Sequence, residues 1–196
     1  MEIEEKVKFR QIQPWFLKWN LLIFNNLIQK RFITFWAALI FLGCQGSPYP
    51  YFEGTFEEAK SVVGSKLILL KFYTNTWISC IRLDVETLSD SAVQTFSKQN
   101  FISLKYNANE EIGNQYFKQY NCRGVPHLLF VDSEGNEVDR IIGFLPPTEY
   151  LLRIEDIAKK RNTLDDYLDR YENGNVSAEI IAGIAIKYED RKENDK

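Results

Sequence analysis

Apolar and polar positions between residues 51 and 160 follow two different periods, which predicts that helices and strands alternate. Apolar runs or strict alternation, as expected of strands, occur in four segments: residues 66–73, 101–106, 127–131 and 137–142. Helical spacing and capping residues occur around them: from Thr55 through Lys60, from Ile78 with an interruption near residues 89–91, from Glu110 to Tyr120, and from Thr148 onward. This order predicts an α/β domain with a parallel core and an antiparallel hairpin at its edge.

The C-terminal segment, residues 162–196, predicts a separate pair of helices. The first spans residues 164–171, and Ser177 caps a longer second helix whose apolar side chains recur at helical spacing. The stretch from Ala182 to Arg191 resembles the first helix of a tetratricopeptide repeat. Two interpretations stay open: a helix that docks on the preceding domain, or the start of a repeat array, which needs about three units.

The N-terminal segment, residues 1–43, predicts a signal peptide or a membrane anchor. Residues 32–42 form an uninterrupted apolar run behind Lys30 and Arg31. The run is shorter than the ~20 residues that span a bilayer, but it fits the apolar region of a signal peptide. The segment from Phe41 to Cys44 resembles a bacterial lipobox, and this resemblance implies that Cys44 is lipidated.

The alternative is an uncleaved anchor, because 31 residues precede the apolar run and signal peptides total roughly 15–30 residues. Both alternatives make the membrane a partner, through a lipid or an N-terminal helix. Both also place the body on the periplasmic side of a bacterial envelope, since the basic residues precede the apolar run. Residues 44–50, rich in turn formers, are then a linker.

Charge and cysteine content exclude several classes of protein. Residues 1–43 contain six Lys/Arg and three Asp/Glu, which gives this segment a net charge of +3. Because the whole chain has a net charge of −3, residues 44–196 have a net charge of −6. An acidic body argues against a nucleic-acid partner, which needs clustered positive charge. The three cysteines are too few for a disulfide framework, and their spacing matches no zinc site. We therefore predict neither a metal nor a cofactor.

Three local motifs resemble the thioredoxin-like superfamily. Residues 71–84, KFYTNTWISCIRLD, align without gaps with the family's strand-to-helix junction, F-Y-x-x-W-C-x-x-C-K-x-L-D. Residues 123–127, RGVPH, resemble its cis-proline loop, and residues 132–143 resemble its closing hairpin. The resemblance implies a thioredoxin fold over residues 51–160, in which helices flank a central mixed sheet.

The aligned junction departs from the family at the reactive positions. Trp77 stands where the resemblance places the nucleophilic cysteine, so the usual C-x-x-C motif becomes W-x-x-C. Cys80 holds the resolving position, one helical turn deeper, where burial raises the pKa of a thiol. Lys71 stands where the family keeps a buried aspartate that accepts the thiol's proton. An indole cannot form a thiolate, so the ordinary dithiol route is excluded.

One hypothesis is that the chain is a binding module for a protein or peptide client. In the family the cis X-Pro bond presents the backbone before it for pairing with an extended peptide, which assigns this role to Val125 and Pro126. Trp77 would supply an amphipathic aromatic contact. His127 is either a pH-sensitive neighbour of this surface or a residue at the strand start bonded to backbone.

The alternative hypothesis is a monothiol thiol-disulfide oxidoreductase. Here Cys80 would be the catalytic residue, with Lys71 or His127 helping to ionise it. Cys80 could also pair with Cys122 if their Cα atoms lie within ~7 Å. The simplest alternative is that Cys80 is only a small buried hydrophobic residue.

Overall fold

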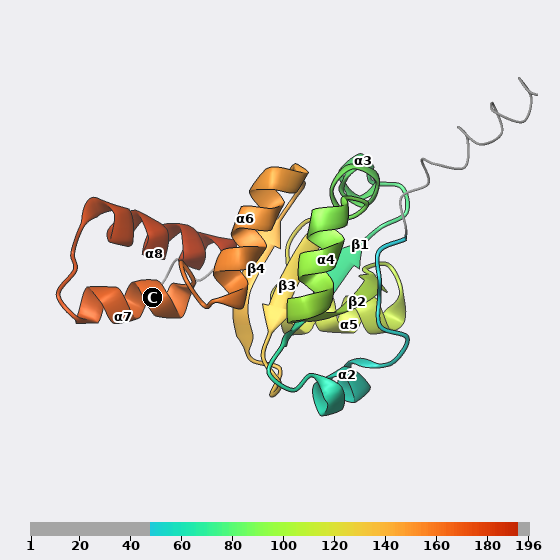
Figure 1. Cartoon of the computed structure of the whole chain (residues 1–196), viewed down its shortest axis with the longest axis horizontal. Helices are drawn as coiled ribbons and strands as arrows, with labels where there is room; N and C mark the ends of the chain where they lie inside the picture. Colours follow the sequence, from blue (N-terminus) through green and yellow to red (C-terminus); the bar gives the residue numbers. More distant parts are fainter. Residues whose placement is uncertain (1–47, 192–196) are drawn as a thin grey trace, which may run out of the picture. The chain divides into compact units, whose positions relative to one another are not determined.

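A computed structural model describes residues 48–191 and contains a four-stranded mixed sheet (Figure 1). The strand order is β2-β1-β3-β4, with bounds as follows: β1 (Leu67–Tyr73), β2 (Phe101–Asn107), β3 (His127–Val131) and β4 (Glu137–Ile142). Strands β1 and β2 are parallel, whereas β3 is antiparallel to both β1 and β4. The predicted parallel core is thus limited to one pair of strands.

Strand β3 follows helix α5 (Glu111–Gln119) and the loop that contains Pro126. It pairs with β1 in the antiparallel direction, from Ile68 opposite Val131 to Phe72 opposite His127. The alternation of helices and strands along the chain does not by itself give this direction.

Helices cover both faces of the sheet and bury two hydrophobic clusters. One face packs against α3 (Ile78–Arg82), the π-helical turn η1 (Leu83–Thr87), α4 (Ser91–Asn100) and α6 (Pro147–Ala158), and the other against α2 (Phe56–Val62) and α5. Within β1, Leu67 and Leu69 belong to the first cluster, whereas Ile68, Leu70 and Phe72 belong to the second. A strand buried on both faces explains the continuous apolar run in the sequence.

Two further helices follow the sheet domain and form a hairpin. They are α7 (Leu164–Glu172), which Thr163 caps through the backbone N–H of Asp166, and α8 (Ala178–Arg191). The helices meet at Gly183, where a Cβ atom would lie 2.6 Å from the ring of Tyr167. A larger residue at position 183 would require the ring of Tyr167 to shift. Figure 1 shows the hairpin beside β4 and α6.

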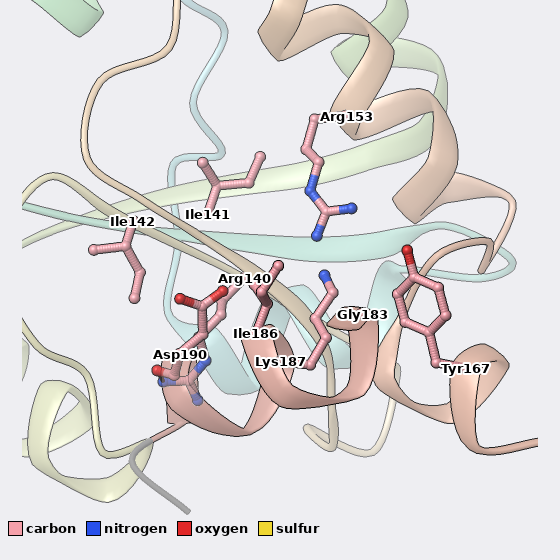
Figure 2. Close-up of a pocket in the computed structure, with 9 residues that line it drawn as sticks. All are labelled: Arg140, Ile141, Ile142, Arg153, Tyr167, Gly183, Ile186, Lys187 and Asp190. Carbon is pink, nitrogen blue, oxygen red and sulfur yellow. Dashed lines mark hydrogen bonds between the residues drawn. The ribbon is translucent and has the colours of Figure 1, made fainter. Parts of the chain in front are cut away.

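Buried charges join the hairpin to the sheet. Asp139 of β4 is fully buried and accepts hydrogen bonds from Lys187 of α8 and from Arg153 of α6, the latter at 2.7 Å. Arg191 at the end of α8 pairs with Glu137 at 2.8 Å. Figure 2 shows Arg153 and Lys187, which line a hollow of about 280 Å³, pointing toward each other. Helix α8 therefore docks on β4, and its cations are already paired with β4 carboxylates.

The predicted signal or anchor segment, residues 1–43, and the predicted lipidation site Cys44 lie outside the described residues. Among residues 48–191, no helix combines the length and the apolar character needed to cross a bilayer.

Candidate functional site at the start of helix α3

Trp77 stands exposed where β1 passes into α3. It is the N-cap residue of α3, and its carbonyl oxygen accepts hydrogen bonds from the backbone N–H groups of Cys80 and Ile81, at 3.0 and 3.2 Å. Its side chain forms no capping hydrogen bond and is 54% exposed. The indole is thus available for contact with a partner, at the position that the sequence alignment assigns to a nucleophilic sulfur.

Cys80 belongs to the same helix but faces inward, and it is almost completely buried, at 1% exposure. It is a free cysteine. Burial raises the pKa of its thiol, and the backbone of Thr74 and the nearby ammonium of Lys71 oppose this effect only in part. The thiol therefore stays protonated at neutral pH, and a protonated, buried thiol is a poor nucleophile.

Lys71 is buried and forms an ion pair with Asp84 of η1, whose side chain is 47% exposed. Burial lowers the pKa of the Lys71 ammonium, while the hydrogen bond and charge of Asp84 act in the opposite direction. The ammonium lies over the rings of Tyr51 and Tyr73, 5.8 and 5.4 Å from their centroids. The resemblance implies a buried aspartate at position 71. This chain has Lys71 there instead, and the carboxylate of Asp84 compensates its positive charge.

The proline loop lies before β3 and contains a cis peptide bond between Val125 and Pro126. The carbonyl oxygen of Pro126 accepts a hydrogen bond from the backbone N–H of Gly143 at 2.8 Å, which ties the loop to the end of β4. Within the described residues, neither the N–H nor the carbonyl of Val125 has a hydrogen-bond partner. Unpaired backbone groups of this kind can pair with an added extended segment.

His127 begins β3 and is fully buried. Its Nδ1 donates to the carbonyl oxygen of Arg123 at 3.2 Å, and its ring centroid lies 6.2 Å from that of Phe117. Its Nε2 has no partner among the described residues. Burial lowers the pKa of His127 to about 4. The imidazole is therefore neutral at physiological pH and lies beneath the surface instead of facing a partner.

Cys122 is the second free cysteine of the described part of the chain. It belongs to the hydrophobic cluster beneath α2 and α5, and burial raises the pKa of its thiol to about 12. Cys80 belongs instead to α3, and the two thiols are not bonded to each other. Residues 48–191 also contain no cluster of three or more side chains suited to hold a metal ion.

The structure adds three apolar residues that the sequence interpretation did not single out. Ile78, Ile81 and Val85 are 63%, 44% and 67% exposed, on the outer side of α3 and η1. Their spacing of three and four residues is the signal that could have revealed them, since it places them on one helical face. We call Trp77, Ile78, Ile81 and Val85 the α3 surface. A cluster of exposed apolar side chains is typical of an interaction site.

The turn η1 lengthens this helix by a π-type hydrogen bond from the N–H of Leu88 to the carbonyl oxygen of Leu83, at 2.8 Å. Its effect is to place Asp84 against Lys71 while Leu83 and Leu88 remain in the core. Single π-turns within helices are frequent at functional sites.

This fold, with an exposed helix start after β1 and a cis-proline loop before β3, defines a thioredoxin-like protein. The family model for the thioredoxin-like domain matches residues 55–158, and the chain belongs to this family. The structure also resembles a putative disulphide-isomerase from Bacteroides thetaiotaomicron, with a TM-score of 0.53 and 26% identity, over 59% of this chain and 98% of the other. A thioredoxin from Thermus thermophilus shares the fold at a TM-score of 0.50 and 19% identity, over 59% and 90% of the two chains.

Sequence relatives include much larger proteins. The thiol:disulfide interchange protein DsbD of Yersinia pestis (strain Pestoides F) is 28% identical over 94 residues, which are 46% of this chain and 16% of DsbD. DsbD of Tatumella citrea is 24% identical over 104 residues, or 52% of this chain and 18% of the relative. The match thus spans less than a fifth of these relatives. It relates the domain to disulfide oxidoreductases.

Proposed function

We propose that this chain is a thioredoxin-like binding module without dithiol activity, and that the α3 surface binds an extended apolar segment of a protein partner. The observation that carries the proposal is the side chain found at each reactive position at the start of α3. Trp77 is exposed at the position of the reactive sulfur, whereas Cys80 is buried and protonated. A site of this kind keeps a surface for recognition but has no exposed nucleophile.

The extended form of the partner segment is supported by the proline loop. Val125 offers both of its backbone hydrogen-bonding groups, since neither is used within residues 48–191. An extended peptide satisfies such groups and directs alternate side chains toward one face. Apolar side chains on that face would contact Trp77 and Ile78, whereas His127 would support the loop from below.

We further propose that the module acts in a bacterial envelope, attached by a lipid on Cys44 or by an uncleaved N-terminal helix. The apolar run behind basic residues and the lipobox-like segment support this location. Metabolic labelling with palmitate tests the lipid. We expect label in the full chain and none in Cys44→Ala, whereas an unlabelled full chain would leave only the helical anchor.

A second candidate function, a monothiol oxidoreductase that uses Cys80, is favoured by one contact. The ammonium of Lys71 lowers the pKa of Cys80. We place this candidate second because burial is the largest influence on that thiol and acts in the opposite direction.

Peptide binding tests the first candidate directly. The probe is a fluorescein-labelled peptide with alternating valine and threonine, titrated with the full chain and followed by anisotropy. Because buried tryptophan contacts at interfaces contribute about 2 kcal/mol or more, we expect Trp77→Ala to weaken binding at least about tenfold. Leu152→Ala is the matched control, since Leu152 is also an exposed apolar residue, at 62%, but lies on α6.

The backbone contact has its own control. A probe with N-methylated central amides cannot pair with Val125, and we expect it to bind more weakly than the unmodified probe. Equal binding by the wild-type chain and Trp77→Ala, or no binding by the wild-type chain, would contradict the proposed function.

A further inference from the structure

A hollow of about 440 Å³ lies beside the α3 surface but shares none of its residues. Its lining includes charged and aromatic side chains from β1, β2, η1 and the segment before α2, together with one amide from the loop after β1: Tyr51, Lys71, Tyr73, Asp84, Lys105 and Asn75. The segment before α2 is held against β2 by a hydrogen bond from the N–H of Phe52 to the carbonyl oxygen of Ser103, at 2.7 Å. The hollow is therefore built from elements with fixed positions.

Two lysines stand side by side in this hollow. Lys71 and Lys105 are register partners on the parallel strands β1 and β2, so their side chains leave the same face of the sheet. Lys71 pairs with Asp84. Within residues 48–191, Lys105 has no carboxylate partner, and its ammonium lies 5.1 Å from the ring centroid of Tyr51. With two ammonium groups and one carboxylate, the hollow has a surplus of one positive charge.

The hollow is also rich in hydrogen-bond donors. The hydroxyl group of Tyr51 is buried and has no hydrogen-bond partner among the described residues. Burial raises the pKa values of Tyr51 and Tyr73, as do the charge of Asp84 at both residues and that of Glu110 at Tyr73, so both hydroxyls stay protonated. The ammonium of Lys71 has three donors, of which Asp84 accepts one. Asp84 is the one carboxylate in the lining, and the donors that it leaves unpaired favour a ligand that accepts hydrogen bonds.

We propose that this hollow is a binding site for a small organic carboxylate with an apolar body. The carboxylate would accept hydrogen bonds from the ammonium groups of Lys105 and Lys71, as charge-assisted bonds. The rings of Tyr51 and Tyr73 would contact the apolar body. A single negative charge matches the surplus in the hollow, whereas a dianion would exceed that surplus by one charge. This inference does not rest on the proposed function, because the α3 surface takes no part in it.

Benzoate is the probe that tests the site, titrated into the full chain and followed by isothermal calorimetry and amide chemical shifts. We expect benzoate to bind and to shift the amide signals of β1 and β2 near Lys71 and Lys105. Lys105→Gln removes the unpaired cation at an exposed position, where the fold tolerates the change. Since a hydrogen bond to a charged group contributes about 1.5–3 kcal/mol, we expect at least tenfold weaker binding.

Matched controls separate the charge from the ring. Lys118→Gln changes an exposed lysine on α5 and is expected to leave benzoate affinity unchanged. Inorganic phosphate and benzylamine test the charge of the ligand, and we expect both to bind more weakly than benzoate. The proposal is overturned if the wild-type chain does not bind benzoate, if Lys105→Gln binds it equally well, or if benzylamine binds as tightly.

Discussion

Lys187 of α8 donates to both carboxylate oxygens of Asp139 in β4, at 2.7 and 2.6 Å, and both side chains are buried. The two residues are 48 positions apart in the sequence. A buried ion pair is weak evidence for net stability, because removing two charges from water has a large cost. It is directional, however, and loss of Lys187 leaves Asp139 with one close cation fewer. The pair therefore fixes how the C-terminal hairpin sits on the sheet.

Replacement of Lys187 tests this relationship. Lys187→Met leaves Asp139 with Arg153 as its nearest cation, and we expect the free energy of unfolding to fall by about 3 kcal/mol at pH 7.5. Urea denaturation measures the loss. Lys159→Met is the control, because Lys159 forms an exposed pair with Glu155 at 3.9 Å and such pairs contribute ~0–1 kcal/mol. Equal losses in the two variants would contradict a docking role for Lys187.

The same variant has a defined dependence on pH. Burial raises the pKa of Asp139 to about 6, with Arg153 acting in the opposite direction. A carboxyl group whose pKa is raised on folding binds its proton more tightly in the folded state, so its contribution favours folding as the pH decreases. In Lys187→Met the Asp139 carboxylate has lost one of its cations and can take up a proton at pH 5. We expect the stability loss to be smaller there than at pH 7.5.

Burial of His127 in its neutral form is expected to reduce the stability of the protein in acid. Its pKa is lowered from 6.5 to about 4 by burial, so the unfolded chain binds a proton at a higher pH than the folded chain does. The contribution is complete above pH 6.5 and is lost as the pH decreases from 6.5 toward 4. At 1.36 kcal/mol per pKa unit, the effect totals about 3 kcal/mol.

His127→Leu isolates this contribution from those of the carboxylates. We measure the free energy of unfolding of both proteins by urea denaturation between pH 7.5 and 4. Because leucine does not titrate, the wild-type protein is expected to lose more free energy of unfolding than His127→Leu as the pH falls. A pH-independent difference would show that the histidine is not buried in its neutral form.

Restoring a sulfur at the helix start tests the interpretation of Trp77. Trp77→Cys places an exposed thiol three residues before Cys80, with the spacing of a C-x-x-C motif, where a helix N-terminus lowers the pKa of a thiol. We expect this variant to form a disulfide with Cys80 and to gain activity in insulin reduction. Leu152→Cys, on α6, is the control that adds an exposed thiol elsewhere. If Trp77→Cys forms no disulfide, the alignment of Trp77 with the nucleophilic position is wrong.

The sequence was sufficient to predict the structural features that depend on residues close together in the chain. The order of strands and helices follows from apolar periodicity, and Thr55 caps α2 together with Glu58, as a local motif can indicate. The thioredoxin fold itself was predicted from three short motifs, and the family match confirms it. These features involve residues close to one another in the chain.

Features that depend on tertiary contact were not predictable. The antiparallel direction of β3 relative to β1 depends on the path of the chain between β2 and β3, which no local pattern gives. The pairing of Lys71 with Asp84 joins a strand to a π-turn, and that of Lys187 with Asp139 joins the hairpin to β4. Burial decides the protonation of Cys80 and His127, and the sequence alone does not give its extent.

Reduction of insulin by the full chain, with dithiothreitol as the electron source, tests the central claim most directly. The claim is that an exposed Trp77 above a buried Cys80 leaves a site that binds without exchanging disulfides. We predict that the wild-type chain and Cys80→Ser both reduce insulin no faster than dithiothreitol alone. Turnover by the wild-type chain that disappears in Cys80→Ser would contradict the account and make Cys80 the catalytic residue of a monothiol oxidoreductase.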